Sequence, residues 1–110
     1  MFVPSPEEFA AAKAQEERRA MRKPVSIRAQ LRPPGSDRLM VDVTDLSETG
    51  FQIKTVYRLQ VGSTVWLAIP SLSALEAIVA WERDRHYGCR FHRPLYPAVF
   101  DHIVALAGTQ

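Results

Sequence analysis

Residues 25–32 read VSIRAQLR, and this stretch alternates strictly between apolar and polar side chains. A repeat of two indicates a β-strand with one buried face, because successive side chains of a strand point to opposite sides of the sheet. PPGS, residues 33–36, then breaks the strand with a turn, and the alternation resumes after it. The stretch therefore predicts the first strand of a sheet that is buried on one face only.

Further short segments of the same kind follow, each ended by a turn signal. They lie near residues 39–44, 51–55, 65–69, 75–81 and 87–91. About six short strands separated by turns predict a small antiparallel barrel, because closing a sheet removes its exposed edges. From Leu95 the apolar positions change to helical spacing, and Gly108 ends that pattern. We therefore expect a mainly β domain, a six-stranded antiparallel barrel followed by a C-terminal helix whose inward face carries Val99, Ile103 and Leu106.

The residues before the barrel have a different composition. SPEE, residues 5–8, provides a helix start with a capping box, and residues 9–21 are rich in good helix formers with few large apolar side chains. Pro24 ends this helix. We divide the chain into an N-terminal helical segment, residues 1–23, and a barrel with its C-terminal helix, residues 24–110.

Composition excludes several classes of protein. A chain of 110 residues has room for one domain, and its 46% hydrophobic content supplies a core. Its apolar stretches fall short of the roughly 20 residues that span a bilayer, and its first residues lack the pattern of a signal peptide. The single cysteine, Cys89, excludes an internal disulfide and is typical of a reducing compartment. We expect a cytoplasmic protein that does not insert into a membrane.

Positive charge gathers in the first third of the chain. Between Lys13 and Arg38 lie eight of the fourteen Lys and Arg residues but only three acidic residues. This excess of +5, in a chain whose net charge is +2, suits the region for contact with an anion. On charge alone, a solvated helix face explains the cluster at least as well.

Two basic pairs in this segment have helical spacing. Arg18 and Arg22 are four residues apart, and so are Arg19 and Lys23, so in a helix the members of each pair project from one side. Two guanidinium groups on one side can hold phosphate oxygens or the O6 and N7 edge of guanine. Surface helices often carry such pairs without a ligand, so the spacing alone is a weak indication.

DLSETG, residues 45–50, is a less common combination. Asp45 continues the register of the apolar residues before it, so a carboxylate stands where the alternation expects a buried side chain, and it needs solvent or hydrogen-bond donors. That carboxylate can accept the N1–H and N2–H₂ donors of guanine, and Ser47 can hydrogen-bond a base or a phosphate. Gly50 permits a positive φ or a close backbone approach. The alternative is a turn that only reverses the chain.

Together the two segments resemble the bipartite ligand motif of the PilZ family. Arg18 and Arg22 precede a small barrel, and Asp45, Ser47 and Gly50 follow as Asp-x-Ser-x-x-Gly. The resemblance implies a receptor for cyclic di-GMP in which these five residues bind the ligand. The arginines would hold guanine edges and phosphates, the aspartate and serine would hold a guanine on the barrel surface, and the glycine would shape the turn.

The resemblance covers roughly residues 17–107, because the closing strands and the terminal helix match the family as well. It implies a PilZ-type β-barrel whose arginine segment is a mobile switch that folds over the ligand, and an unidentified effector protein as the partner that receives the signal. Many family members carry a basic residue immediately before the first motif arginine, where this chain has Glu17. An acid at this position would disfavour an intercalated dimer of ligand molecules, whereas Arg19 could supply part of the missing positive charge. One bound ligand and an intercalated dimer therefore both stay open.

Other reactive side chains favour structural roles. The three histidines lack the spacing of a metal site, and Cys89 alternates with Tyr87 and Phe91, which favours core packing. Trp81 lies on an apolar face of its strand, and we expect it to pack rather than to stack on a ligand. The sequence shows no arrangement typical of a catalytic site, so we expect neither an enzyme nor a cofactor or metal besides the nucleotide ligand.

Two other functions stay open at this point. A nucleic-acid-binding barrel would use the basic segment, although the strand faces lack interleaved aromatic residues for base stacking. A PilZ-like interaction module that no longer binds nucleotide would have the same fold, although the complete motif argues against it.

Overall fold

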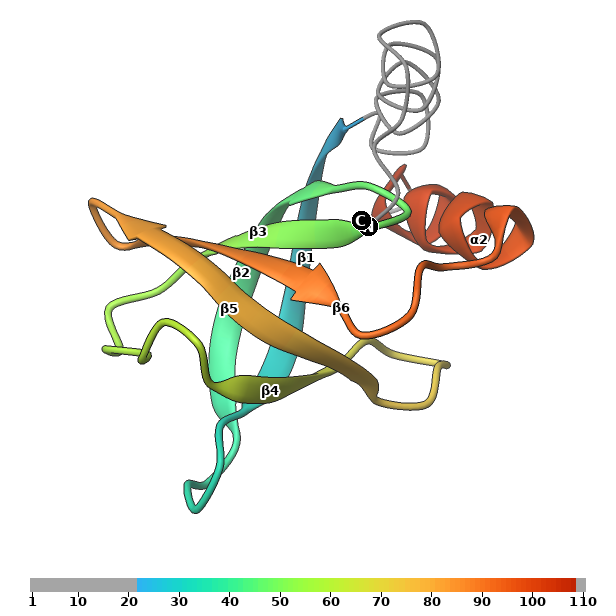
Figure 1. The fold of residues 1–110 in the computed structure, drawn as a ribbon. Helices are drawn as coiled ribbons and strands as arrows, with labels where there is room; N and C mark the ends of the chain where they lie inside the picture. The colour runs from blue at the N-terminus through green and yellow to red at the C-terminus, as the bar shows by residue number, and fades with distance from the viewer. Residues whose placement is uncertain (1–21, 109–110) are drawn as a thin grey trace, which may run out of the picture.

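Six strands and one helix make up the part of the chain that the computed structural model describes, residues 22–108 (Figure 1). The elements are β1 (Lys23–Arg32), β2 (Leu39–Leu46), β3 (Gly50–Lys54), β4 (Thr64–Ala68), β5 (Leu75–Arg83), β6 (His86–Phe91) and α2 (Pro97–Gly108). All neighbouring strands are antiparallel, and the sheet closes into a barrel in the order β1-β2-β3-β6-β5-β4. The predicted barrel and C-terminal helix are confirmed. The predicted N-terminal helix lies outside the described residues.

The barrel interior is filled by the apolar half of the alternating pattern. On β1, Ile27, Ala29 and Leu31 are buried, whereas Arg28 and Gln30 between them are exposed. The other strands fill the core with Val41, Val43, Leu46, Phe51, Ile53, Val65, Leu67, Ala77, Val79, Tyr87, Cys89 and Phe91. Each large aliphatic side chain buried in this way stabilises the fold by roughly 1.5–3 kcal/mol, so the alternation that identifies the strands also supplies most of the stability.

Helix α2 lies against β1 at one end of the barrel (Figure 1). Ile103 is fully buried and Phe100 nearly so, whereas Val99 and Leu106 of the predicted inward face are only half-buried. The inward face is therefore turned slightly from the predicted one, toward Phe100. Among residues 22–108, no helix has the length and hydropathy needed to cross a membrane.

The hydrogen-bond ladder of the described strands is regular except at three register shifts. The shifts fall between Pro24 and Ile27 on β1, between Val43 and Asp45 on β2, and between Val79 and Trp81 on β5. One extra residue in a strand turns every later side chain to the other face of the sheet. As a result, Asp45 and Trp81 lie on the outer face. An unbroken alternation would have placed both side chains inside the barrel, because the odd-numbered residues before them point inward.

The shift on β2 answers the question that the sequence raises about Asp45. Thr44 is the extra residue, because Val43 pairs with Ile53 while Asp45 pairs with the next residue, Gln52. The carboxylate is thereby turned out of the core, and its side chain is 22% exposed. Burial of an unpartnered charge is avoided by one inserted residue.

Candidate functional site

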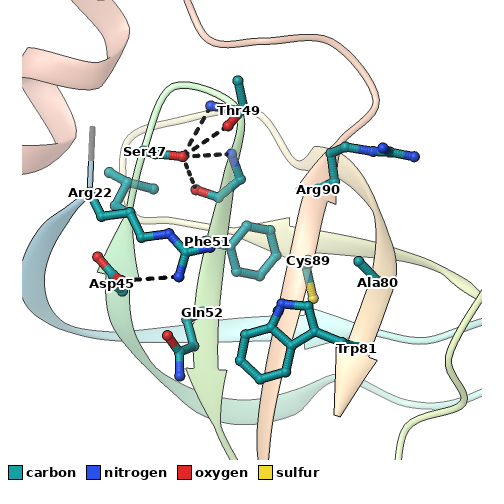
Figure 2. A pocket seen from close by; sticks show the side chains of 13 residues that line it. Arg22, Asp45, Ser47, Thr49, Phe51, Gln52, Ala80, Trp81, Cys89 and Arg90 are labelled. Atoms are coloured by element: carbon teal, nitrogen blue, oxygen red, sulfur yellow. Dashed lines mark hydrogen bonds and ion pairs between the residues drawn. The ribbon is translucent and has the colours of Figure 1, made fainter. Parts of the chain in front are cut away.

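A cavity of about 180 Å³ opens on the outer face of the barrel where these shifts converge (Figure 2). Beneath it runs a row of cross-strand partners on β2, β3, β6 and β5, which we call the pocket row: Asp45, Gln52, Gly88 and Trp81. Arg22, just before β1, and the turn between β2 and β3 complete the rim. The cavity thus joins the described arginine of the predicted motif to the whole of its second half.

Arg22 and Asp45 meet at one edge of the cavity. The Nη1 atom of Arg22 lies 3.7 Å from Oδ2 of Asp45, and the two side chains are 60% and 22% exposed (Figure 2). The register explains the contact, because Pro24 on β1 is the cross-strand partner of Asp45 on β2. A long ion pair with an exposed arginine contributes at most about 1 kcal/mol, so a ligand can separate the two groups at little cost.

Ser47 orders the turn between β2 and β3 from within. Its side chain is buried, and its Oγ atom accepts hydrogen bonds from the backbone N–H groups of Thr49 at 3.2 Å and Gly50 at 3.1 Å. The hydroxyl can donate to the Gly50 carbonyl oxygen at 3.3 Å or pair with the Thr49 hydroxyl at 3.1 Å. These contacts occupy the group. The turn-forming role that the sequence left open is therefore observed, whereas a free hydroxyl facing the cavity is not.

Gly50 is required by space and not by backbone angle. Its φ lies outside the left-handed region, and a Cβ atom placed there would collide with the carbonyl oxygen of Cys89. The Cα of Arg90 would also be only 3.2 Å away. Of the two reasons that the sequence offers for this glycine, the close backbone approach holds and the positive φ does not.

Trp81 is the residue whose face the sequence prediction assigned wrongly. The shift after Val79 removes it from the apolar face of β5, and its half-buried indole lies over Gly88, where a Cβ atom would overlap the ring. Trp81 therefore forms the wall of the cavity at the opposite end of the row from Asp45 (Figure 2). A glycine inside a strand marks a close approach, so Gly88 was the signal in the sequence that could have identified this wall.

Between these two ends lie residues that the sequence prediction did not single out. Gln52 offers a half-buried amide next to Asp45, and Thr49 contributes to the rim from the turn. Arg90 also lines the cavity, but its guanidinium points away from the other side chains in Figure 2. Ordinary outward-facing polar residues carry no pattern that distinguishes them in the sequence.

Cys89 lines the cavity from the core side, and it is chemically quiet. Burial raises the pKa of its thiol from 9.0 to about 12, so the reactive thiolate is scarce near neutral pH. Arg18 and Arg19, the other predicted ligand arginines, lie outside the described residues.

The comparisons with known proteins agree with this geometry. A family model, the PilZ domain, matches residues 16–107, a span that contains both motif segments, the whole barrel and most of α2. No curated protein matches the chain. PilZ domains are in general binding modules that act as receptors for cyclic di-GMP. Because the match covers nearly the whole chain and the closed six-stranded barrel accompanies it, the chain belongs to the PilZ domain family.

Proposed function

We propose that this protein binds cyclic di-GMP over the pocket row and relays the presence of the ligand to an effector protein. The observation that carries the proposal is the contact between Arg22 and Asp45, which brings the described arginine of the motif to its aspartate on the outer face of the barrel. A cavity walled by an indole lies directly beside that contact.

Asp45 and Trp81 recognise one guanine from two directions. The Asp45 carboxylate accepts the N1–H and N2–H₂ donors of the base, and hydrogen bonds to a charged group contribute roughly 1.5–3 kcal/mol each. The Trp81 indole presents a flat apolar surface to the base, and stacking on an aromatic side chain contributes roughly 1–3 kcal/mol. Both residues reach the same face of the sheet only because of the register shifts before them.

Arg22 leaves Asp45 when the base arrives and turns to the ligand. Its planar guanidinium matches either two phosphate oxygens or the O6 and N7 edge of guanine. Its 60% exposure leaves it free to rotate between these partners. Arg18, which belongs to the motif, and Arg19, which lies next to it, supply further guanidinium groups from the chain before β1.

Ser47 and Gly50 act as positioning residues in this proposal. The hydroxyl of Ser47 fixes the turn that follows Asp45, and Gly50 lets β3 lie close against β6. Together they hold the carboxylate and the cavity floor in one arrangement before the ligand binds, which reduces the entropy lost on binding.

The arginine segment is the switch. Ordering a basic segment over the ligand costs conformational entropy that only the bound nucleotide offsets, so the ordered form accumulates when ligand is present. Glu17 stands directly before Arg18 and opposes a second anionic ligand there, so one bound molecule is the expected stoichiometry. Hydrogen exchange of residues 16–22, which precede β1, tests the switch, since we expect protection with cyclic di-GMP and none without it.

A route from the ligand turn to the rest of the surface is built into the backbone. The Thr49 carbonyl accepts from Phe91 N–H at 2.9 Å, and the Glu48 carbonyl accepts from Leu95 N–H at 2.7 Å. These bonds tie the turn to the segment that leads into α2, so a ligand that moves the turn also moves the entry of the helix. A receptor for an intracellular messenger would act in the cytoplasm, in keeping with a chain whose one cysteine is free.

Calorimetric titration with cyclic di-GMP tests the proposal. We expect saturable binding by the wild type and none by Asp45→Ala, with Asp37→Ala as the control, because Asp37 is an exposed carboxylate in the loop between β1 and β2 and forms no ion pair with a described residue. Titrations with GTP and with single-stranded DNA accompany it. Equal affinity for the DNA would favour the nucleic-acid-binding barrel, and no binding of any nucleotide would leave a protein-interaction module.

A further inference from the structure

A second row of side chains lies beside the pocket row on the same outer face. Its members, which we call the basic row, are cross-strand partners on β3, β6 and β5: Lys54, His86 and Arg83. Each stands two positions along its strand from a member of the pocket row. Positions two apart point to the same side of a sheet and are separated by roughly 6.5 Å, so the basic row lies next to the pocket row, just outside the residues that line the cavity.

The charges of the basic row have no partner among residues 22–108. Lys54 and Arg83 are both exposed, and neither forms an ion pair with a described residue. The nearest carboxylate along the row is Asp42, the cross-strand partner of Lys54, and it pairs with Arg28 on its other side at 3.4 Å. Lys54 and Arg83 carry the same charge on the two strands that flank β6, and neither gains an ion pair there, so fold stability does not account for the arrangement.

The hairpin that ends the row is built at a cost to stability. Asp84 and Arg85 form its two-residue turn, and both have positive φ, 49° and 68°. Aspartate tolerates this conformation, but arginine is strained in it, where asparagine or glycine is the common choice. The turn therefore places the exposed cation of Arg85 next to His86, in a position that a stability-optimised hairpin would give to another residue, with the exposed carboxylate of Asp84 before it.

The histidine of the row is held in a defined orientation. Its Nδ1 atom lies 3.0 Å from the carbonyl oxygen of Asp84, and because a carbonyl only accepts, Nδ1 carries the hydrogen in this bond. The ring is therefore fixed by its own turn, and in this tautomer Nε2 is an acceptor, so the positive charge for an anion comes from Lys54 and Arg83 on either side of the ring. Neighbouring strands are about 4.8 Å apart, so an anion above His86 lies within reach of the long side chains of both Lys54 and Arg83.

We propose that the basic row is an anion subsite that takes a phosphate of cyclic di-GMP whose guanine occupies the cavity. The inference rests on the proposed function and adds residues that lie outside the motif. Arg22 binds one phosphate at the Asp45 end of the cavity. The basic row binds the other phosphate, two positions along the strands from the pocket row. A ligand with two phosphates can engage both, whereas GMP, whose one phosphate is held at the Arg22 end, cannot, so the subsite favours cyclic di-GMP over GMP.

The test is a calorimetric titration of the full chain with cyclic di-GMP and, separately, with GMP. The variants are Lys54→Gln, Arg83→Gln and the double variant, and Arg38→Gln is the control because it removes one exposed charge from the loop between β1 and β2. We expect each single variant to weaken cyclic di-GMP about threefold to tenfold and the double variant about tenfold to a hundredfold, since exposed charge-assisted contacts are partly screened by solvent. The control and the affinity for GMP stay unchanged.

The outcomes separate the subsite from the proposed function. Normal binding by the double variant overturns the subsite alone, and no binding by the wild type overturns the proposed function and the subsite with it. If the wild type binds two molecules of cyclic di-GMP and the double variant binds one with the same first-site affinity, the row holds a second ligand molecule. That result contradicts the proposal that the row takes a phosphate of the ligand in the cavity. If the same variants lose affinity for single-stranded DNA while their affinity for cyclic di-GMP is unchanged, the row is reassigned to nucleic acid.

A second variant uses the strained hairpin. Arg85→Asn relieves the left-handed strain, so we expect the Tm to rise by a few degrees while the affinity for cyclic di-GMP falls. A rise in both quantities, or a fall in both, contradicts a hairpin that trades stability for anion binding.

Discussion

The two tryptophans of the chain both face outward from the barrel, yet their surroundings are opposite. Trp66 lies at the regular seam between β4 and β1, where its cross-strand partner Arg32 places a guanidinium carbon 4.8 Å from the ring centroid. Trp81 lies at the bulged seam between β5 and β6, where its partner is Gly88 and a cavity opens beside it. The first ring is covered by a cation of its own protein, and the second lines the cavity. Of these two outward tryptophans, the one that lines a cavity is the one for which a bulge and a glycine make room.

The largest effect is expected where glycine makes room against the backbone. Gly50→Ala forces a Cβ into the Cys89 carbonyl group, which cannot move without breaking the pairing of β3 with β6, so we expect a loss of about 3 kcal/mol or more in the free energy of unfolding. Gly88→Ala meets only the Trp81 side chain, and rotation of the indole limits the loss to roughly 1–2 kcal/mol.

Urea denaturation measures both glycine variants. Equal losses, or a larger loss for Gly88→Ala, would contradict the difference between a close approach to the backbone at Gly50 and one to a side chain at Gly88.

The next effect separates the two tryptophans in binding. Trp81→Ala removes the stacking wall, and we expect the affinity for cyclic di-GMP to fall about tenfold to a hundredfold. Trp66→Ala removes a ring that faces Arg32 and leaves the affinity unchanged. Isothermal titration gives both values. Equal losses of affinity in the two variants would contradict the proposal that the ligand binds beside Trp81 and not beside Trp66.

A smaller effect is expected at the turn that closes the Asp45 end of the pocket row. Ser47→Ala leaves two backbone N–H groups, those of Thr49 and Gly50, without their acceptor, and we expect about 1–2 kcal/mol of lost stability with a modest loss of affinity. Ser63→Ala is the control, because its hydroxyl bonds only Gln60 in an exposed loop. Thermal denaturation distinguishes them, and an unchanged Tm for Ser47→Ala argues against the positioning role.

The smallest effect concerns the thiol beneath the cavity. The folded pKa of Cys89, about 12, exceeds its ordinary value of 9.0, so the folded state keeps its proton as the pH rises while the unfolded state loses it. Stability from this group is therefore present below pH 9 and declines between pH 9 and 12. We expect iodoacetamide to label the folded chain very slowly at pH 8 and the urea-unfolded chain readily, as mass spectrometry will show. Fast labelling of the folded chain contradicts the buried position.

The fold could be predicted from the sequence because a period of two places every core residue correctly as long as a strand is unbroken. The same rule fails at Asp45 and Trp81, since the extra residues Thr44 and Ala80 reverse the parity and nothing in their identity marks a bulge. The site residues Asp45 and Gly50 were nominated by resemblance to a family, and Trp81 was missed because the alternation assigned it to the core.

The contact between Arg22 and Asp45 could not have been obtained from sequence spacing. It depends on the pairing of Pro24 with Asp45, which follows from the register shift in β1. Likewise, the basic row is invisible in the sequence, because Lys54 and the hairpin residues meet only after β3 and β6 pair. Local pattern predicts the elements, and the register between them creates the surface.

The central claim is that the bulged seam, and not the regular one, holds the ligand. The direct measurement is the tryptophan fluorescence of two variants titrated with cyclic di-GMP: Trp66→Phe, which leaves Trp81 as the sole indole, and Trp81→Phe, which leaves Trp66. We predict saturable quenching in the first variant and no change in the second. A signal that follows Trp66, or binding by the Trp66→Phe protein that leaves the Trp81 emission unchanged, would contradict the account.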